Sequence, residues 1–353
     1  MSYYRYLVRL KPLEPFFFGG EFTFGADDTR KKETSRYSAI STQFPQQTAL
    51  LGMLRKLLLI EHGHLTMHKK GEWVDSRGRG SDDNNYATAL ALVGNEPFSY
   101  EKSINLGVIE SISPIFIASN SDYFCTNAKD NDFVKQEIEG SFSFGKGVEK
   151  AFVFEGFDAK KSETKAFIST KEVLKNYSDF FEAVDSVGIK KTEDKQSDED
   201  GFFRKRSYYP KEHTNASFCF VLEVTQPLEM KKRVVTLGAD QSSFALEIEE
   251  DFSKNYDEVF DAVQTKKAYG RIVLNSQTLL TQEAYNLCSF ILGERKSYRQ
   301  LKGNRGKKSK RYYLLEKGSV LFSDELSKLE EALNQAHLQK IGINNYTKIE
   351  GKN

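Results

Sequence analysis

The chain has 353 residues, enough for two domains, and its 51 Lys+Arg are balanced by 50 Asp+Glu to a net charge of +1. This balance argues against a strongly basic nucleic-acid binder, and a hydrophobic content of 39% argues against global disorder. No run approaches the roughly 18 apolar residues of a membrane span, and no signal peptide is evident, so we expect a cytoplasmic protein. The cysteines, Cys125, Cys219 and Cys288, form no CxxC pair, which argues against a disulfide framework and a zinc knuckle.

The first half of the chain mixes strand and helix patterns. Residues 3–10 alternate in hydropathy and predict a strand, and Gly19-Gly20 between aromatic runs predicts a hairpin. Pro45 precedes an apolar stripe at helical spacing, which predicts a helix over residues 50–60. The other predicted elements are an inserted loop at 62–86, a helix at about 86–93, a strand at 111–118, a hairpin at 140–157 and a helix at 171–184.

The second half alternates strands and short helices in the same irregular way. Residues 190–206 carry mixed charge around Gly201 and are interpreted as an exposed excursion. The other predicted strands are one at 218–224, two joined by a loop at 234–248, one at 272–274, and two broken at Gly318 within 312–322. Helices are predicted at 254–263, 283–292 and 323–337. No repeat of roughly 20–50 residues is evident, which argues against a solenoid, and the irregular alternation of strands and helices indicates an α+β protein.

The net charge hides a strong asymmetry along the chain. Twelve basic and two acidic residues lie between Lys266 and Tyr313, a net +10, so the rest of the chain sums to −9. One interpretation is a pair of solvated, mutually compensating faces. The other is a polyanion-binding surface, which the tyrosines interleaved with these bases favour.

Nine of these bases fall within residues 295–311, where Gly303 and Gly306 permit close approach of the backbone to phosphates. Such contacts would give affinity without sequence selection. The helix that starts at Gln46 offers a second candidate anchor, because its free N–H groups can hold a phosphate. The same residues equally suit simple helix initiation.

No motif for catalysis or for a cofactor is recognised. The sequence lacks a Walker loop, a dinucleotide fingerprint, a zincin motif and a nucleophile elbow, so no cofactor is expected. His62, His64 and His68 have a spacing that could serve a metal, but their polar loop favours solvated histidines. The Asp27-Asp28 and Asp82-Asp83 pairs are interpreted as turn chemistry rather than cation ligands.

Five segments, taken in their order along the chain, resemble the RAMP superfamily of CRISPR proteins. In the first, Pro45, Gln47, Thr48, Gly52 and Arg55 are similar to the pattern of the first helix in that superfamily. The others are VGIKK with GFFRKRSYY (187–191 and 201–209), LGADQSSFALEI (237–248), EKGSVLF (316–322) and IGINNYTKI (341–349). Together they look most like the subunit that caps the 5′ end of the CRISPR RNA in type III-B (Cmr) effector complexes. Ala239 departs from the pattern, since a second glycine is usual there.

The resemblance implies an α+β fold of two ferredoxin-like (RRM-like) modules. The N-terminal module would span 1–185, with insertions at about 62–86 and 120–157, and the C-terminal module 186–353, with the basic segment 295–311. It also implies a ribonucleoprotein subunit of antiviral defence that binds the 5′ handle of the crRNA. Its partners would be the large polymerase-cyclase subunit and a backbone RAMP subunit. Contact with target RNA would be indirect, and no association with a membrane is expected.

In that family this subunit is not the target-cleaving nuclease, which agrees with the missing catalytic motif. We expect the RNA-binding side chains to be Arg36, Gln46, Gln47, Thr48, Arg55, Gln241, Ser242, Arg295, Lys296, Arg299, Lys302, Lys308, Arg311, Asn344 and Lys348. Two alternatives stay open. One is an RNA-processing endonuclease of the same superfamily, with His213 near Tyr208 and Tyr209 as its crude candidate site. The other is a structural adaptor without RNA contact.

Overall fold

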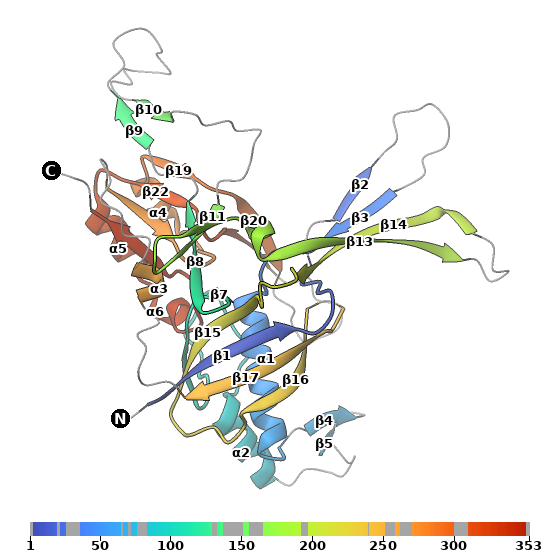
Figure 1. Ribbon diagram of the computed structural model, residues 1–353. Helices are drawn as coiled ribbons and strands as arrows, with labels where there is room; N and C mark the ends of the chain where they lie inside the picture. Colours follow the sequence, from blue (N-terminus) through green and yellow to red (C-terminus); the bar gives the residue numbers. More distant parts are fainter. Residues whose placement is uncertain are drawn as a thin grey trace. The chain divides into compact units, whose positions relative to one another are not determined.

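A computed structural model describes most of the chain (Figure 1). The described residues are 3–19, 22–25, 36–64, 66–69, 72–75, 83–128, 133–136, 151–154, 165–191, 197–238, 240–250, 258–261, 270–299 and 310–350. The chain divides into two compact units that are interleaved along the sequence. Unit 1 comprises residues 1–98, 104–121 and 177–252, and unit 2 comprises residues 99–103, 122–176 and 253–353.

Unit 1 is built on an antiparallel sheet whose strands come from distant parts of the sequence. In spatial order the strands are β7 (Phe116–Ser119), β15 (Ser217–Val224), β1 (Tyr4–Pro12), β17 (Ser242–Glu250) and β16 (Lys232–Leu237), and β6 (Ile109–Ile112) also pairs with β15. The register sets Val8 of β1 between Phe220 of β15 and Ile248 of β17. Because β15 is central, all of its side chains except that of Glu223 are buried.

Helix α1 (Gln47–Glu61) confirms the helix predicted after Pro45. It buries Leu50, Leu54 and Leu57 and packs against β16 and the second helix, α2 (Asp83–Val93). The chain order β1, α1, β6/β7, β15, β17 is that of a ferredoxin-like module. Between β15 and β17, where that fold has its second helix in the sequence, this chain has the strand β16.

A second sheet of unit 1 contains the longest hairpin of the described chain. Its strands, in spatial order, are β13 (Phe181–Lys191), β14 (Ser197–Pro210), β3 (Arg36–Ile40) and β2 (Phe22–Gly25) (Figure 1). Within the expected excursion at 190–206, the described residues 190–191 and 197–206 are strand, and residues 192–196 lie outside the described residues. Gly20, in the turn of the hairpin expected at Gly19-Gly20, lies outside the described residues. On either side of that turn, Phe16 bridges to Tyr208 and β2 pairs with β3.

The helix expected over 171–184 is wrong. The chain there forms β12 (Leu174–Lys175), a 3-10 turn η1 (Tyr177–Asp179) and the start of β13. The reason is tertiary, because Phe181 stacks on the Phe218 ring at 5.1 Å and Tyr177 donates its hydroxyl to the Gln43 carbonyl at 2.8 Å. Tyr177 and Phe181 have the spacing of one helix face, but here they pack against other aromatic rings in the core.

Unit 2 contains a second ferredoxin-like module. Its chain order is β18 (Arg271–Leu274), α4 (Gln282–Leu287), β19 (Phe290–Leu292), β22 (Val320–Phe322), α5 (Leu326–Leu333) and β23 (Tyr346–Ile349). All its strand pairs are antiparallel, in the spatial order β19-β22-β18-β23. Ile272, Leu321 and Leu329 are fully buried between the sheet and α5. The two helices expected at 283–292 and 323–337 are shorter, because β19 follows α4 and a short α6 (Ala336–Gln339) follows α5.

The remaining elements decorate these two modules. They are β4 (Thr66–Lys69) with β5 (Glu72–Asp75), β8 (Asp122–Ala128) with β11 (Lys165–Ser169) and β12, β9 (Phe133–Gln136) with β10 (Ala151–Phe154), α3 (Glu258–Asp261), and β20 (Arg295–Arg299) with β21 (Arg311–Leu315). The observed fold is α+β, as predicted. The two ferredoxin-like modules follow one another along the chain, but the first continues past the expected boundary at 185/186, because β15 and β17 pair with β1. Only the compact units are interleaved, since residues 99–103 and 122–176 belong to unit 2. None of the helices described is long and apolar enough to cross a membrane.

Candidate nucleic-acid interface

The hairpin β20–β21, which we call the basic hairpin, has two chemically different faces. Its register sets Ser297 opposite Tyr313 and Tyr298 opposite Tyr312. Side chains alternate between the faces of a strand, so one face carries Tyr298, Tyr312 and Leu314, which are buried. The outer face carries Arg295, Ser297, Arg311 and Tyr313, which are exposed. The hairpin is thus anchored by one face and presents arginines and a tyrosine on the other.

A polar network secures the buried face. Tyr298 donates its hydroxyl to Glu316 Oε1 at 2.5 Å, and Gln277 Nε2 donates to the Tyr298 hydroxyl at 2.5 Å and to Glu316 Oε1 at 3.1 Å. Burial, together with the adjacent Glu316 carboxylate, raises the pKa of Tyr298 far above its ordinary value. The hydroxyl therefore stays protonated and serves as a fixed donor to a carboxylate that is only 8% exposed.

The outer face holds its cation on an aromatic ring. The guanidinium carbon of Arg295 lies 4.5 Å from the centre of the Tyr313 ring. The two residues are diagonal neighbours on adjacent strands, since Arg295 stands opposite Leu315 and Tyr313 opposite Ser297. A cation–π contact orients the guanidinium without neutralising it, so the positive charge stays available to an anion.

Other bases of this segment have acidic partners or lie outside the described residues. Lys296 Nζ is 3.3 Å from Glu294 Oε1, and Lys310 forms an ion pair with Glu101. Arg299 pairs with Arg311 through the backbone. Lys302 and Lys308 lie outside the described residues. Of the six bases expected here to bind RNA, Arg295 and Arg311 are the two that the structure places on the exposed outer face.

The start of α1 brings together Gln46, Gln47 and Thr48. Gln46 is the N-cap residue with extended backbone, and the Thr48 hydroxyl lies 3.4 Å from its Oε1. Gln47 is 5% exposed and donates Nε2 to the Ser113 carbonyl at 2.9 Å, which ties α1 to the segment after β6. Gln46 and Thr48, each partly exposed, are therefore the better candidates for contact with RNA at this helix end.

Arg55 lies on the same helix and joins it to two loop carbonyls. Its Nη1 donates to the Glu96 carbonyl and its Nη2 to the Asn105 carbonyl, both at 3.1 Å. Burial lowers the pKa of this guanidinium from its ordinary value. We assign Arg55 a structural role in this conformation, because its donors are turned toward the protein backbone.

The loop between β16 and β17 is locked onto the segment before β2. Gly238, at φ +93°, approaches the Phe17 carbonyl so closely that a Cβ would lie 2.3 Å from its oxygen. The buried Ser242 hydroxyl accepts the Phe17 N–H at 3.1 Å, so Ser242 also has a structural role. Gln241 is exposed at the loop tip, and neighbouring Asp240 forms an ion pair with Lys205.

The predicted tail residues are divided between the interior and the surface. Asn344 is fully buried, accepts the Leu279 N–H through Oδ1 at 2.7 Å and donates Nδ2 to the Leu279 carbonyl at 3.2 Å. Its backbone N–H donates to the carbonyl of Gln277, the residue that supports the basic hairpin. Lys348 Nζ lies 2.8 Å from Glu350 and 3.3 Å from Glu330. Asn344 therefore has a structural role, because it supports the basic hairpin through Gln277 and is not exposed to a ligand.

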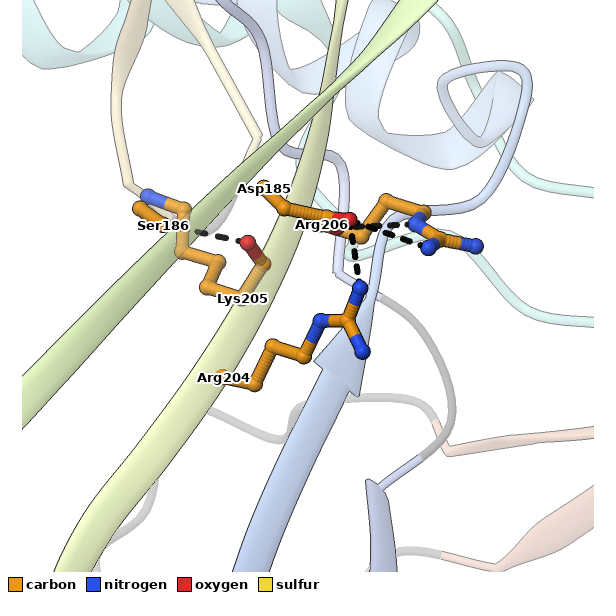
Figure 2. A network of polar contacts seen from close by, with 5 residues as sticks. All are labelled: Asp185, Ser186, Arg204, Lys205 and Arg206. Carbon is orange, nitrogen blue, oxygen red and sulfur yellow. Dashed lines mark hydrogen bonds and ion pairs between the residues drawn. The ribbon is translucent and has the colours of Figure 1, made fainter.

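The structure reveals a cationic group that was not among the predicted site residues. On the β13–β14 hairpin, Arg206 contacts both carboxylate oxygens of Asp185 at 2.9 and 3.0 Å, and Arg204 contacts the same carboxylate at 2.6 Å (Figure 2). Hydrogen bonds from Arg206 and then Arg204 lower the pKa of Asp185 far below its ordinary range. The exposed Val187 and Ile40 lie nearby in register. The available sequence signal was the spacing of Arg204 and Arg206, because residues two apart lie on the same face of a strand.

Arg36 and the histidines complete the predicted positions. Arg36 begins β3, where its backbone pairs with Gly25. His62 Nδ1 lies 3.0 Å from the Leu58 carbonyl at the end of α1. His213 is exposed in the turn after β14 at φ +69°, while the Tyr208 ring packs against Tyr177 inside the aromatic core. Within the described ranges, no three His, Cys, Asp or Glu residues gather as they would around a metal ion.

Comparison with known proteins gives a limited likeness. No family model matches the chain. No curated protein matches it either. Two solved structures each contain a chain that resembles this one, the type III-B Cmr-beta complex bound to cognate target RNA and the same complex bound to cognate target RNA and AMPPnP in state 1. In each, the matched chain is 15% identical with a TM-score of 0.49, over 97% of this chain and 96% of the other. At this level the likeness assigns no residue a role.

Proposed function

We propose that this protein is a non-catalytic crRNA-binding subunit of a type III-B CRISPR effector complex in the cytoplasm. It would cap the 5′ handle of the crRNA and bridge the large polymerase-cyclase subunit to the backbone RAMP subunits in antiviral defence. Two features support the proposal. One is the ordered series of RAMP-like segments, and the other is the presence of two ferredoxin-like modules, a fold that commonly binds single-stranded RNA.

The observation that carries the proposal is the outer face of the basic hairpin. Arg295 and Arg311 are exposed there beside Tyr313, while Lys296 and Lys310 of the same hairpin region have acidic partners. Arginine contacts of this kind bind phosphates regardless of base sequence. Phosphate binding of this sort suits a subunit that must bind the backbone of the handle along its length.

The test is charge reversal with a matched control. The Arg295→Glu, Arg311→Glu variant should bind single-stranded handle RNA more weakly and with a shallower dependence on salt. Each lost phosphate contact removes roughly 0.7 from the slope of log affinity against log salt. The control is Lys232→Glu, Arg233→Glu, which makes the same charge change at exposed positions of β16 in unit 1.

The outcomes separate the possible functions. If both variants bind like the wild type, with unchanged salt slope, the assignment of RNA binding to this face is wrong. Equal weakening by the two variants would indicate long-range attraction rather than an interface. Incubation of the purified protein with repeat RNA should leave the RNA intact, and specific cleavage would favour the endonuclease alternative.

A further inference from the structure

Tyr313 is exposed where its neighbours in sequence are buried. It is 45% exposed, whereas Tyr312 is 8% and Leu314 0% exposed. Successive side chains of β21 point to opposite faces of the strand, which explains why Tyr313 lies on the outer face. Its ring is therefore not packed in the core. A large ring on a cationic face, next to exposed Arg295 and Arg311, is a surface that nucleic-acid bases can use for stacking.

The contact between Arg295 and Tyr313 supplies flat groups for stacking. The guanidinium carbon lies over the phenol ring at 4.5 Å from its centre, so two flat groups lie next to each other on the exposed face. Unstacked RNA bases pack on aromatic rings and on guanidinium planes alike. Bases inside a duplex already have both faces covered by neighbouring base pairs, so such a unit selects unpaired RNA.

The platform is held in place before any ligand arrives. The underside of the same hairpin is fixed by the Tyr298–Glu316–Gln277 hydrogen bonds and by burial of Leu314. A backbone bridge between Thr278 and Leu315 joins β21 to the segment after β18. Because the strands are fixed, binding a base requires little further ordering of the protein.

We propose that Arg295 and Tyr313 form a stacking platform for one unpaired base of a single-stranded RNA, with Arg311 on the same face contacting an adjacent phosphate. This inference deepens the proposed function and rests on it for the class of ligand. It adds a selection step that phosphate contacts lack, namely the choice of single-stranded over duplex RNA.

The experiment compares ring and charge variants on two RNA probes. Tyr313→Ala and Tyr313→Phe are titrated against a single-stranded handle oligonucleotide and against a blunt duplex of the same sequence. Tyr313→Ala should weaken single-strand binding by between about five-fold and a hundred-fold, the effect of losing one stacked base, and leave duplex binding unchanged. Tyr313→Phe keeps the ring and should bind like the wild type.

A further variant tests the plane of the guanidinium. Arg295→Lys keeps the charge but loses the flat group, so it should weaken single-strand binding and retain the wild-type salt slope. Unfolding midpoints of all variants should match the wild type, because these side chains are exposed.

The platform and the proposed function fail in distinguishable ways. If Tyr313→Ala binds single strands like the wild type while the Arg295→Glu, Arg311→Glu variant is weakened, the platform is wrong and phosphate binding stands. If Tyr313→Ala weakens duplex and single strand equally, base stacking is wrong. If neither variant changes binding, both proposals are wrong.

Discussion

The two arginine-bearing hairpins, β13–β14 and β20–β21, hold their guanidinium groups in opposite ways. On β13–β14, Arg204 and Arg206 are both bound to the Asp185 carboxylate (Figure 2). On β20–β21, Arg295 lies over the Tyr313 ring instead. Each arrangement orients an arginine, but only the carboxylate also cancels charge. Two hairpins with similar basic sequences therefore differ in how strongly they attract an anion.

The hairpins also differ in what lies beneath them. The basic hairpin buries Tyr298, Tyr312 and Leu314 on one face. On the β13–β14 hairpin, Val187 is 68% and Phe203 42% exposed. The basic hairpin is fixed by a buried face, whereas the β13–β14 hairpin is held at its base by Phe181 in the aromatic core and by the pairing of β14 with β3. Farther along that hairpin, its apolar side chains stay exposed. The contrast predicts different sensitivities to mutation.

The largest expected effect comes from removing the buried anchor of the basic hairpin. Leu314→Ala should lower the free energy of unfolding by roughly 2 to 5 kcal/mol, because Leu314 is fully buried and the change leaves a cavity. Val187→Ala, at an exposed position of the other hairpin, should change it by no more than about 0.5 kcal/mol. Urea denaturation followed by circular dichroism measures both. Similar losses in the two variants would contradict the contrast in anchoring.

The next effect concerns the titration of Asp185. The arginines lower its pKa in the folded protein, so the ion pairs stabilise the fold at every pH above the ordinary aspartate pKa of about 3.9. That stabilisation is lost only as the pH falls further, through the lowered folded pKa. An NMR titration of aspartate-labelled protein, with Asp185→Asn for assignment, follows the carboxyl directly.

Arginine variants test which partner dominates that shift. Arg206→Gln should raise the pKa of Asp185 more than Arg204→Gln does, since the Arg206 hydrogen bonds are the larger cause. An Asp185 carboxyl that titrates in the ordinary range in the wild type would show that the clamp is not formed in solution.

The smallest expected effect comes from comparing two bases of the basic hairpin, one with an acidic partner and one exposed on the outer face. Lys310 forms an exposed ion pair with Glu101, whereas Arg311 is exposed on the outer face. Lys310→Ala should leave the unfolding midpoint unchanged, because exposed ion pairs contribute little, and should reduce RNA affinity less than Arg311→Ala. Fluorescence anisotropy with single-stranded RNA measures this difference. Equal losses would mean that total charge, rather than the face on which it lies, decides binding.

Local pattern was sufficient for some elements and insufficient for others. Helix α1 was predictable because Pro45 and the leucine stripe act within a single segment. The strand at Phe181 was not, because its aromatics pack on Phe218, a residue from another part of the sequence. The same distinction explains the interleaved units, since no local signal marks β15 and β17 as partners of β1.

The candidate site was predictable to a similar extent. The basic segment and its tyrosines were visible as a charge run, and Arg295 and Arg311 do lie on an exposed face. Burial of Gln47, Ser242 and Asn344 was not visible, because a polar side chain enters the interior only where backbone groups from elsewhere satisfy it. The Asp185 clamp was missed because its members meet only through the register of two strands.

The sequence by itself determined the α+β class, the first helix and the concentration of a net charge of +10 between Lys266 and Tyr313 in a chain of net charge +1. These follow from composition and local periodicity. The tertiary structure decided which of those charges are exposed, which are paired with carboxylates, and which residues form each module. Strand register and burial set these outcomes, and both depend on residues far apart in the chain.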